Sequence, residues 1–169
     1  MRQIIRVIPL LAVLFICTSC GMMPWSKKGS DGAAGYEKNA LTINFRSDRQ
    51  LNLYQGRSHS LVVCVYQLKE PNSFNQLADE KDGIYKLMEC GRFDGSVAYV
   101  KRQIVQPGED TGGFVDMAEG SKYLGVAAGY FDLNRKGSVR LFTLEKKWFG
   151  DPVVDLILGP QEITDIKVH

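Results

Sequence analysis

The feature that most limits the fold of this chain is a series of short apolar runs separated by turn residues. Leu41, Ile43 and Phe45 alternate with polar neighbours, which predicts a strand with one buried face. Residues 61–66 are apolar throughout and rich in β-branched side chains, as in a strand buried on both faces. Similar runs follow at 96–105, 114–117, 123–131, 138–144, 153–158 and 163–168. These runs, about eight in all, predict a mainly β fold, an antiparallel β-sandwich.

One stretch has helical spacing instead. Asn72 and Ser73 offer N-cap side chains, and apolar residues then recur three and four positions apart in 74–78 and in 84–88. Gly83 lies between these two groups. We therefore expect a short helical insert at about 73–90, either two short helices or one helix broken at Gly83.

The first 19 residues have the pattern of an export signal. Arg2 and Arg6 precede an apolar run that is shorter than the roughly 20 residues needed to cross a bilayer. Thr18 and Ser19 are small and stand directly before Cys20, which resembles a bacterial lipobox. In a lipobox the cysteine is acylated and becomes the first residue of the mature protein. The sequence therefore predicts a lipoprotein signal peptide at 1–19 and a covalent lipid on Cys20; the alternative is an ordinary secreted protein cut nearby.

The charge balance bears on the kind of partner. The chain has 21 basic and 19 acidic residues, and both excess charges lie in the predicted signal peptide. The mature chain is thus neutral overall. A nucleic-acid binder needs a concentrated excess of Lys and Arg to displace counterions, so we expect no nucleic-acid partner.

The mature chain divides into a linker and one folded body. Residues 21–39 have no apolar period and are rich in Gly, Ser, Lys and Asp, so residues 20–39 are predicted to be the lipidated cysteine followed by a flexible linker. Residues 40–169 remain, which is enough for one compact core. This division predicts a single sandwich domain held on a tether.

Little in the sequence suggests chemistry. His59 and His169 are the only histidines and lie far apart, and no cluster has the spacing of metal ligands. The carboxylates are scattered, and neither a nucleophile elbow nor a phosphate-binding glycine loop is present. The sequence therefore predicts a protein without a metal site or a cofactor, and not an enzyme.

Two cysteines remain after the signal peptide is removed and Cys20 is acylated. They are Cys64, in the strand predicted to be buried on both faces, and Cys90, at the end of the helical insert. In an oxidising compartment such a pair is a candidate disulfide. The alternative is two buried free thiols that pack as small apolar side chains.

The connection at 46–60, after the first strand, is long for a hairpin at about fifteen residues, and long loops are often functional. It places apolar side chains among polar ones, which is costly unless a partner or the body covers them. One interpretation is a short extra strand that folds back on the body. The other is a partner-binding loop with Leu53 and Tyr54 as anchors; its candidate residues are Arg49, Gln50, Leu51, Asn52, Leu53 and Tyr54.

An ordered series of motifs across 41–130 resembles TssJ, the outer-membrane lipoprotein family of bacterial type VI secretion systems. The motifs are Leu51-Asn52, Gly56-Arg57-Ser58, the strand at 61–69, Phe74 with Ala78-Asp79, Gln106-Pro107-Gly108-Glu109, and the run at 123–128 followed by Tyr130. The predicted lipobox agrees with this resemblance independently.

The resemblance implies a transthyretin-like β-sandwich with a helical element, anchored in the outer membrane and facing the periplasm. TssJ-like proteins bind the periplasmic C-terminal domain of TssM, an inner-membrane protein partnered by TssL. The loop between the first two strands is the family's main contact, which corresponds to 47–60 here. An alternative of a different class is a lipoprotein carrier that holds a small apolar ligand or a glycan within or between its sheets.

Overall fold

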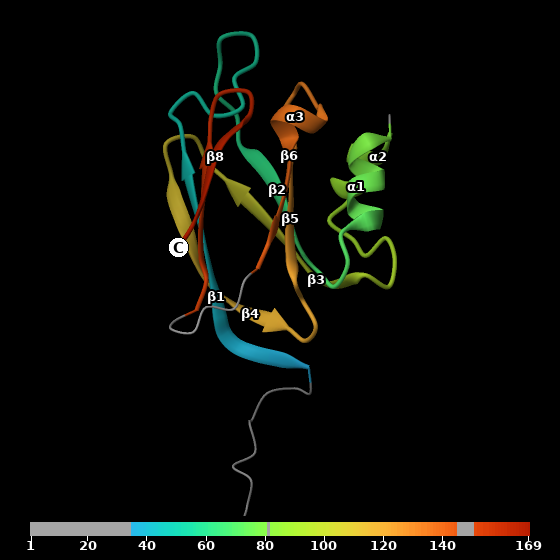
Figure 1. Ribbon diagram of the computed structural model, residues 1–169. Helices are drawn as coiled ribbons and strands as arrows, with labels where there is room; N and C mark the ends of the chain where they lie inside the picture. Colours follow the sequence, from blue (N-terminus) through green and yellow to red (C-terminus); the bar gives the residue numbers. More distant parts are fainter. Residues whose placement is uncertain (1–34, 81, 145–150) are drawn as a thin grey trace, which may run out of the picture. The chain divides into compact units, whose positions relative to one another are not determined.

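The computed structural model describes residues 35–80, 82–144 and 151–169. The predicted signal peptide, Cys20 and most of the predicted linker lie outside these residues. Within them the chain forms eight strands in two four-stranded sheets that pack face to face (Figure 1). No helix of the described part is long and apolar enough to cross a membrane. The prediction of a mainly β sandwich with a short helical insertion is confirmed.

Each sheet contains strands that are distant in the sequence. Sheet I has the order β4-β1-β7-β8, with β1 at Tyr36–Ser47, β4 at Asp110–Ala118, β7 at Val153–Leu158 and β8 at Ile163–Val168. Sheet II has the order β3-β2-β5-β6, with β2 at Leu61–Leu68, β3 at Val97–Val105, β5 at Tyr123–Ala128 and β6 at Val139–Thr143. The connection from β1 to β2 therefore crosses from one sheet to the other.

One pair of strands departs from the antiparallel arrangement. β7 runs parallel to β1, with Thr42 opposite Val153 and Ser47 opposite Leu158. β7 follows β6, a strand of the other sheet, so the chain re-enters sheet I in the direction of β1. The alternation of apolar and polar residues indicates which face of a strand is buried and not the direction of the strand. The sequence could therefore not distinguish a parallel from an antiparallel pair.

Two strands of sheet I begin earlier than predicted. β1 starts at Tyr36, inside the stretch predicted to be linker, because Tyr36 and Glu37 pair with the end of β4 across an irregularity in the register. β4 starts at Asp110 and contains Gly112, with φ of 153°. A Cβ at Gly112 would lie 2.3 Å from the carbonyl oxygen of Ile43, so the close approach of β1 requires glycine there.

The main core fills the space between the two sheets. Leu41, Ile43 and Phe45 of β1 point into it, as their alternation predicts. Val63 and Val65 of β2 meet them from sheet II. Each of these side chains is almost fully buried, and burial of a side chain of this size contributes about 1.5–3 kcal/mol.

A second core lies on the outer face of sheet II, where α1 (Asn72–Asp79) and α2 (Gly83–Leu87) pack (Figure 1). The opposite side chains of β2, including Tyr66, are buried under these helices, which explains why this strand is apolar on both faces. Phe74 of α1 lies so close to Gly125 of β5 that a Cβ there would approach the ring to 2.6 Å.

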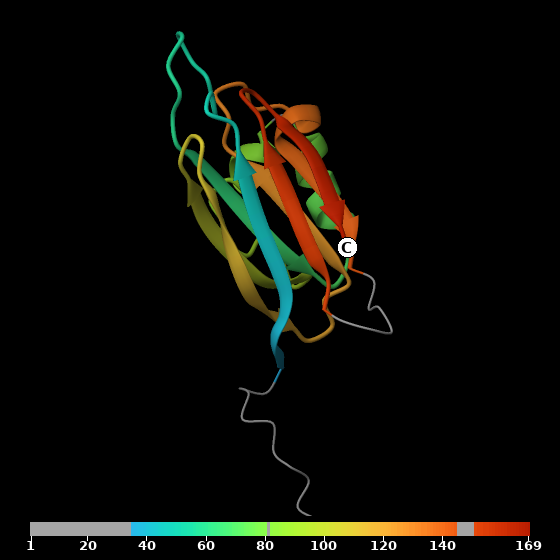
Figure 2. The ribbon, with the colours of Figure 1, turned by 90° about the vertical axis from the view of Figure 1, so that its left-hand side faces the viewer.

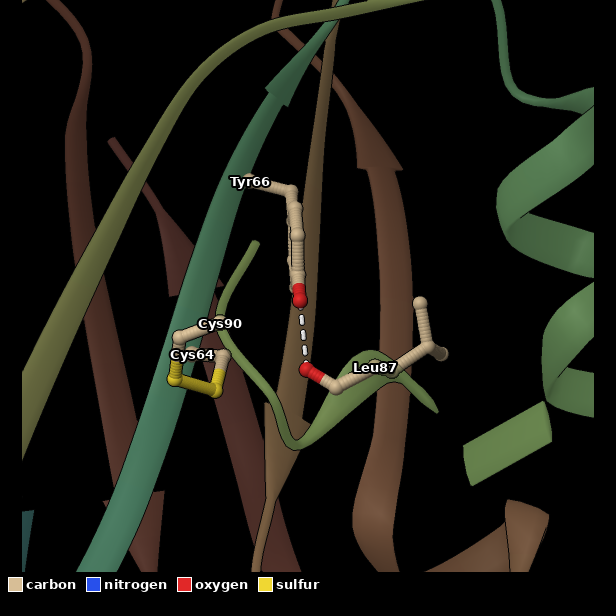
Figure 3. Close-up of a disulfide and its surroundings, with 4 residues drawn as sticks. All are labelled: Cys64, Tyr66, Leu87 and Cys90. Carbon is tan, nitrogen blue, oxygen red and sulfur yellow. Dashed lines mark hydrogen bonds between the residues drawn. A yellow bond between two sulfur atoms is a disulfide. The ribbon is translucent and has the colours of Figure 1, made fainter. Parts of the chain in front are cut away.

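The helical layer is also fastened by polar and covalent links. Figure 3 shows a disulfide between Cys64 of β2 and Cys90, whose Cα atoms are 5.2 Å apart. In the same view the Tyr66 hydroxyl donates a hydrogen bond to the carbonyl oxygen of Leu87. Burial raises the pKa of Tyr66, and the charge of Glu89 adds to that rise. The hydroxyl therefore stays protonated and remains a donor.

A one-turn helix absent from the sequence prediction, α3 at Arg135–Ser138, precedes β6. Its N-cap is Asn134, whose side-chain oxygen accepts a hydrogen bond from the backbone N–H of Gly137 at 2.8 Å. Four residues give no apolar period, so hydrophobic spacing could not reveal this element.

Candidate partner-binding surface

The β1–β2 loop, residues 48–60, forms one end of the sandwich (Figure 2). Its base is tied to two neighbouring turns. The backbone N–H of Asp48 donates to the carbonyl oxygen of Leu158 at 2.9 Å, and the Asp48 carbonyl accepts from Gly108 at 3.0 Å. Leu51 is fully buried in the main core. These contacts hold the first half of the loop in one position.

Asn52 connects the β1–β2 loop with the chain after β5. It is 5% exposed, and its side-chain amide donates to the carbonyl oxygen of Ser60 at 3.1 Å. The amide oxygen accepts from the backbone N–H of Phe131, also at 3.1 Å. The backbone of Asn52 is left-handed, with φ of 49°, a conformation that asparagine tolerates better than most residues. One side chain thus fixes both the loop and the position of Phe131.

The tip of the loop is a tight turn. Tyr54 and Arg57 exchange two backbone hydrogen bonds of 2.9 and 3.0 Å, and Gln55 and Gly56 between them have φ of 50° and 74°. Two consecutive residues with positive φ are typical of a two-residue hairpin turn of type I′. The pairing is an isolated bridge. The loop thus forms a pinned turn and not the short extra strand considered as the alternative.

Two exposed aromatic rings stand together at this end. Tyr54 stacks on Phe131, with ring centroids 4.3 Å apart and an interplanar angle of 18°. The rings of His59 and Phe131 are edge-on to each other, with centroids 5.0 Å apart. Tyr54 is 46% exposed and Phe131 54%, so both present area to solvent despite the stack. This pair is the central feature of the surface.

A groove of about 260 Å³ runs beside the pair. The turn between β7 and β8 forms its other wall, and the backbone N–H of Leu53 donates to the carbonyl oxygen of Pro160 at 2.7 Å. The lining residues are Asn52, Leu53, Tyr54, Phe131, Asp132, Pro160 and Gln161. Side chains from three connections therefore converge on one concave, partly apolar surface.

The structure separates the six residues predicted to bind a partner. Tyr54, Arg49 and Gln50 are exposed and Leu53 is half-buried, so these four can touch another molecule. Leu51 and Asn52 are buried and support the loop from below. Reasoning from sequence missed Phe131, because it ends an apolar run that was interpreted as strand. Its only signal is its position beyond Gly129 and before the mostly polar stretch at 132–136.

No three His, Cys, Asp or Glu side chains among the described residues lie close enough to hold a metal ion. The polar contacts of Asn52 are structural. What this arrangement can do is present two rigid aromatic rings and a shallow groove to a macromolecule.

A model of the family described as type VI secretion lipoprotein (SciN, VasD, EvfM, TssJ) matches residues 39–164. A comparison with curated protein sequences finds no match. Among solved structures, the T6SS lipoprotein TssJ1 from Pseudomonas aeruginosa is 19% identical with a TM-score of 0.61, covering 76% of this chain and 95% of that one. Lip from Serratia marcescens, a membrane-bound component of the type VI secretion system, is 19% identical with a TM-score of 0.58, covering 76% and 96%.

A third similar chain comes from a structure described as the T6SS protein TssM C-terminal domain from EAEC. It is 21% identical with a TM-score of 0.55, and the alignment covers 76% of this chain and 96% of that one. At this level of identity the solved structures show a shared fold. The family model, which spans most of the sandwich, shows more: this chain belongs to the TssJ family of type VI secretion lipoproteins.

Proposed function

We propose that this chain is an outer-membrane lipoprotein, held by a lipid on Cys20, whose β1–β2 loop docks the periplasmic C-terminal domain of a TssM-like inner-membrane protein. Through that protein it would join a TssL-like partner and help assemble the membrane complex of the secretion system. The single observation that carries the proposal is the exposed Tyr54–Phe131 stack on a loop whose backbone is already fixed.

The fixed backbone of the loop lowers the entropic cost of binding a partner. Exposed aromatic side chains in preformed surfaces are the usual centres of binding energy at protein interfaces. A mobile loop would lose conformational entropy on binding, whereas this one is ordered beforehand by Leu51, by Asn52 and by its bond to Pro160. The loop can therefore use the buried area of Tyr54 and Phe131 for affinity.

The position of the loop supports a bridging role. It follows Ser47 at one end of β1, whereas Tyr36 begins the strand at the other end (Figures 1 and 2), and the predicted tether precedes Tyr36 in the sequence. A 12-residue strand is about 40 Å long, so the binding surface stands well away from the point of attachment. A lipid anchor restricts the body to one leaflet and raises its effective concentration toward a partner that spans the periplasm. Similar chains occur in structures described as the TssM C-terminal domain and as a type VI membrane complex.

The carrier alternative has less support. It requires a closed apolar cavity within or between the sheets, yet the space between them is filled by buried side chains from both layers, such as Leu41, Phe45, Leu124 and Leu156. Binding at an exposed aromatic surface explains the described residues better than storage of a ligand in the core.

Calorimetric titration of the mature protein with the periplasmic domain of its own TssM-like partner tests the proposal. We expect Tyr54→Ala and Phe131→Ala each to weaken binding by about 1 kcal/mol or more, because each removes exposed aromatic area from the centre of the surface. Tyr85→Ala is the matched control, since Tyr85 lies on α2 and is 61% exposed. Unchanged affinity in both Tyr54→Ala and Phe131→Ala, or an equal loss in Tyr85→Ala, would contradict the assignment.

A further inference from the structure

A second aromatic group, in which Tyr36 and Phe114 are exposed and Tyr99 is half-buried, lies away from the β1–β2 loop. Tyr36, the first residue of β1, packs edge-on against Tyr99 of β3, with ring centroids 6.4 Å apart and an interplanar angle of 85°. Phe114 of β4 stands beside them and is 71% exposed; Tyr36 is 40% exposed. Together with Lys101, Val115 and Asp116 they line a groove of about 360 Å³, called here the aromatic groove.

The aromatic groove continues into a second hollow of about 320 Å³ that shares Tyr36 and begins at Gly35. The aromatic groove lies between β3 and β4, which are edge strands of the two sheets, and the second hollow lies between the start of β1 and the end of β4 with the turn that follows it. Phe114 is the most exposed large apolar side chain among the described residues. Exposing it to water carries a free-energy cost that a covering apolar phase would remove.

The sequence places this surface next to the tether. Gly35 lines the second hollow, and 14 residues separate it from Cys20, a contour length of at most about 50 Å. An acylated Cys20 would keep the aromatic groove within reach of the lipid surface at all times. The β1–β2 loop, at the opposite end of β1, would then be the part of the body farthest along the strand from the anchor.

We propose that the aromatic groove is a membrane-docking surface that takes the headgroups and upper acyl chains of the leaflet holding the lipid on Cys20. This inference rests on the lipid anchor of the proposed function. Tyrosine rings prefer the headgroup level of a bilayer, where one end is apolar and the other is wet. Phe114 enters the acyl boundary, and Lys101 meets the lipid phosphate while its stem covers the groove.

Asp116 is the one acid that lines the aromatic groove itself, whereas Glu37 and Glu119 line the second hollow. The Asp116 carboxylate accepts a hydrogen bond from the backbone N–H of Asn39 at 2.9 Å, so its charge is partly satisfied within the chain. A few aromatic rings bind a membrane weakly on their own. Next to an acyl anchor they need only orient a body that is already at the surface, because the anchor supplies the high local concentration.

Photocrosslinking of the mature lipidated protein tests the proposal. Phe114 is replaced by p-benzoylphenylalanine, the protein is reconstituted into vesicles of phosphatidylethanolamine and phosphatidylglycerol, and the products of irradiation are identified by mass spectrometry. We expect a phospholipid adduct at position 114. The same replacement is made at Phe131, which is 54% exposed on the partner-binding surface, and at Ile104, which is 50% exposed on β3. Neither control should give a lipid adduct.

The proposal would be overturned by the absence of a lipid adduct at position 114, by lipid adducts of equal yield at all three positions, or by a crosslink from position 114 to a second copy of the chain or to the tether itself. A Cys20→Ser variant keeps the two proposals separate. If this variant stays with the vesicles as well as the lipidated protein does, the anchor in the proposed function is wrong. If only the lipidated protein is retained and position 114 gives no lipid adduct, the docking surface alone is wrong.

Discussion

The outer faces of the two sheets are stabilised in different ways. On sheet II, α1 and α2 cover the strands, and Phe74, Tyr66 and a disulfide are buried beneath or beside them. On sheet I no described helix covers the strands (Figure 2), and the outer face carries a polar group in which Asp155 is held by Asn44, Arg46 and His169. We therefore expect stability to be concentrated on the covered face. Substitutions on the bare face should lower the free energy of unfolding less.

The largest effect is expected on the covered face. Phe74→Ala removes a fully buried ring that packs on Tyr66 and Gly125, and we expect a loss of about 3–5 kcal/mol in the free energy of unfolding. Urea denaturation of the mature protein measures this loss. Tyr85→Ala, an exposed ring on α2, serves as the control and should stay within about 0.5 kcal/mol of the wild type. A loss in Phe74→Ala as small as that in Tyr85→Ala would mean that the helical layer contributes little.

The disulfide gives the next effect. The bond closes a loop with a sequence separation of 26 between Cys64 and Cys90, and loop-closure entropy predicts a loss of about 3 kcal/mol when both are replaced by alanine. Affinity for the TssM-like domain should be unchanged, because Leu51 of the β1–β2 loop belongs to the main core, whereas the two cysteines belong to the second core. Denaturation with and without reductant, followed by titration with the partner domain, checks both parts. A fall in affinity equal to the fall in stability would break the separation between the covered face and the binding surface.

Asn52 lies in the β1–β2 loop, which leaves sheet I and enters sheet II. Asn52→Ala removes two hydrogen bonds and places alanine at a positive φ, for an expected loss of about 2 kcal/mol in unfolding free energy. Asn52→Gly removes the same hydrogen bonds but relieves the backbone strain, so it should recover about 1 kcal/mol of that loss.

The two Asn52 variants also separate stability from binding. Both should weaken binding to the partner domain, because both release Phe131 from the loop. Binding at wild-type affinity by Asn52→Gly would show that the side-chain bonds do not position the aromatic pair.

The sequence predicted the parts of this molecule that depend on local periodicity. The alternation of Leu41, Ile43 and Phe45 revealed the inward face of β1, and the apolar run at 61–66 predicted a strand buried on both faces. It could not predict that β7 runs parallel to β1, because a buried face looks the same in either direction. Nor could it place Phe131 beside Tyr54, because that contact joins residues far apart in the chain through the side chain of Asn52.

The smallest effect is expected on the bare face and depends on pH. A hydrogen bond from Asn44, at 2.8 Å, is the first cause that holds the pKa of Asp155 below its ordinary value, and the charges of Arg46 and His169 add to it. A carboxyl whose pKa is lower in the folded state stabilises the protein above its ordinary pKa. That contribution is lost as the pH falls below about 4 and through the lowered pKa.

Asp155→Asn should therefore flatten the dependence of unfolding free energy on pH in this acidic range, while changing stability at neutral pH less than Phe74→Ala does. Urea denaturation across the range, with Asp165→Asn as an exposed control on β8, measures the difference. An unchanged pH dependence in Asp155→Asn would show that Asp155 does not supply this pH-dependent stability. A loss at neutral pH as large as that of Phe74→Ala would show that the bare face is as important for stability as the covered face.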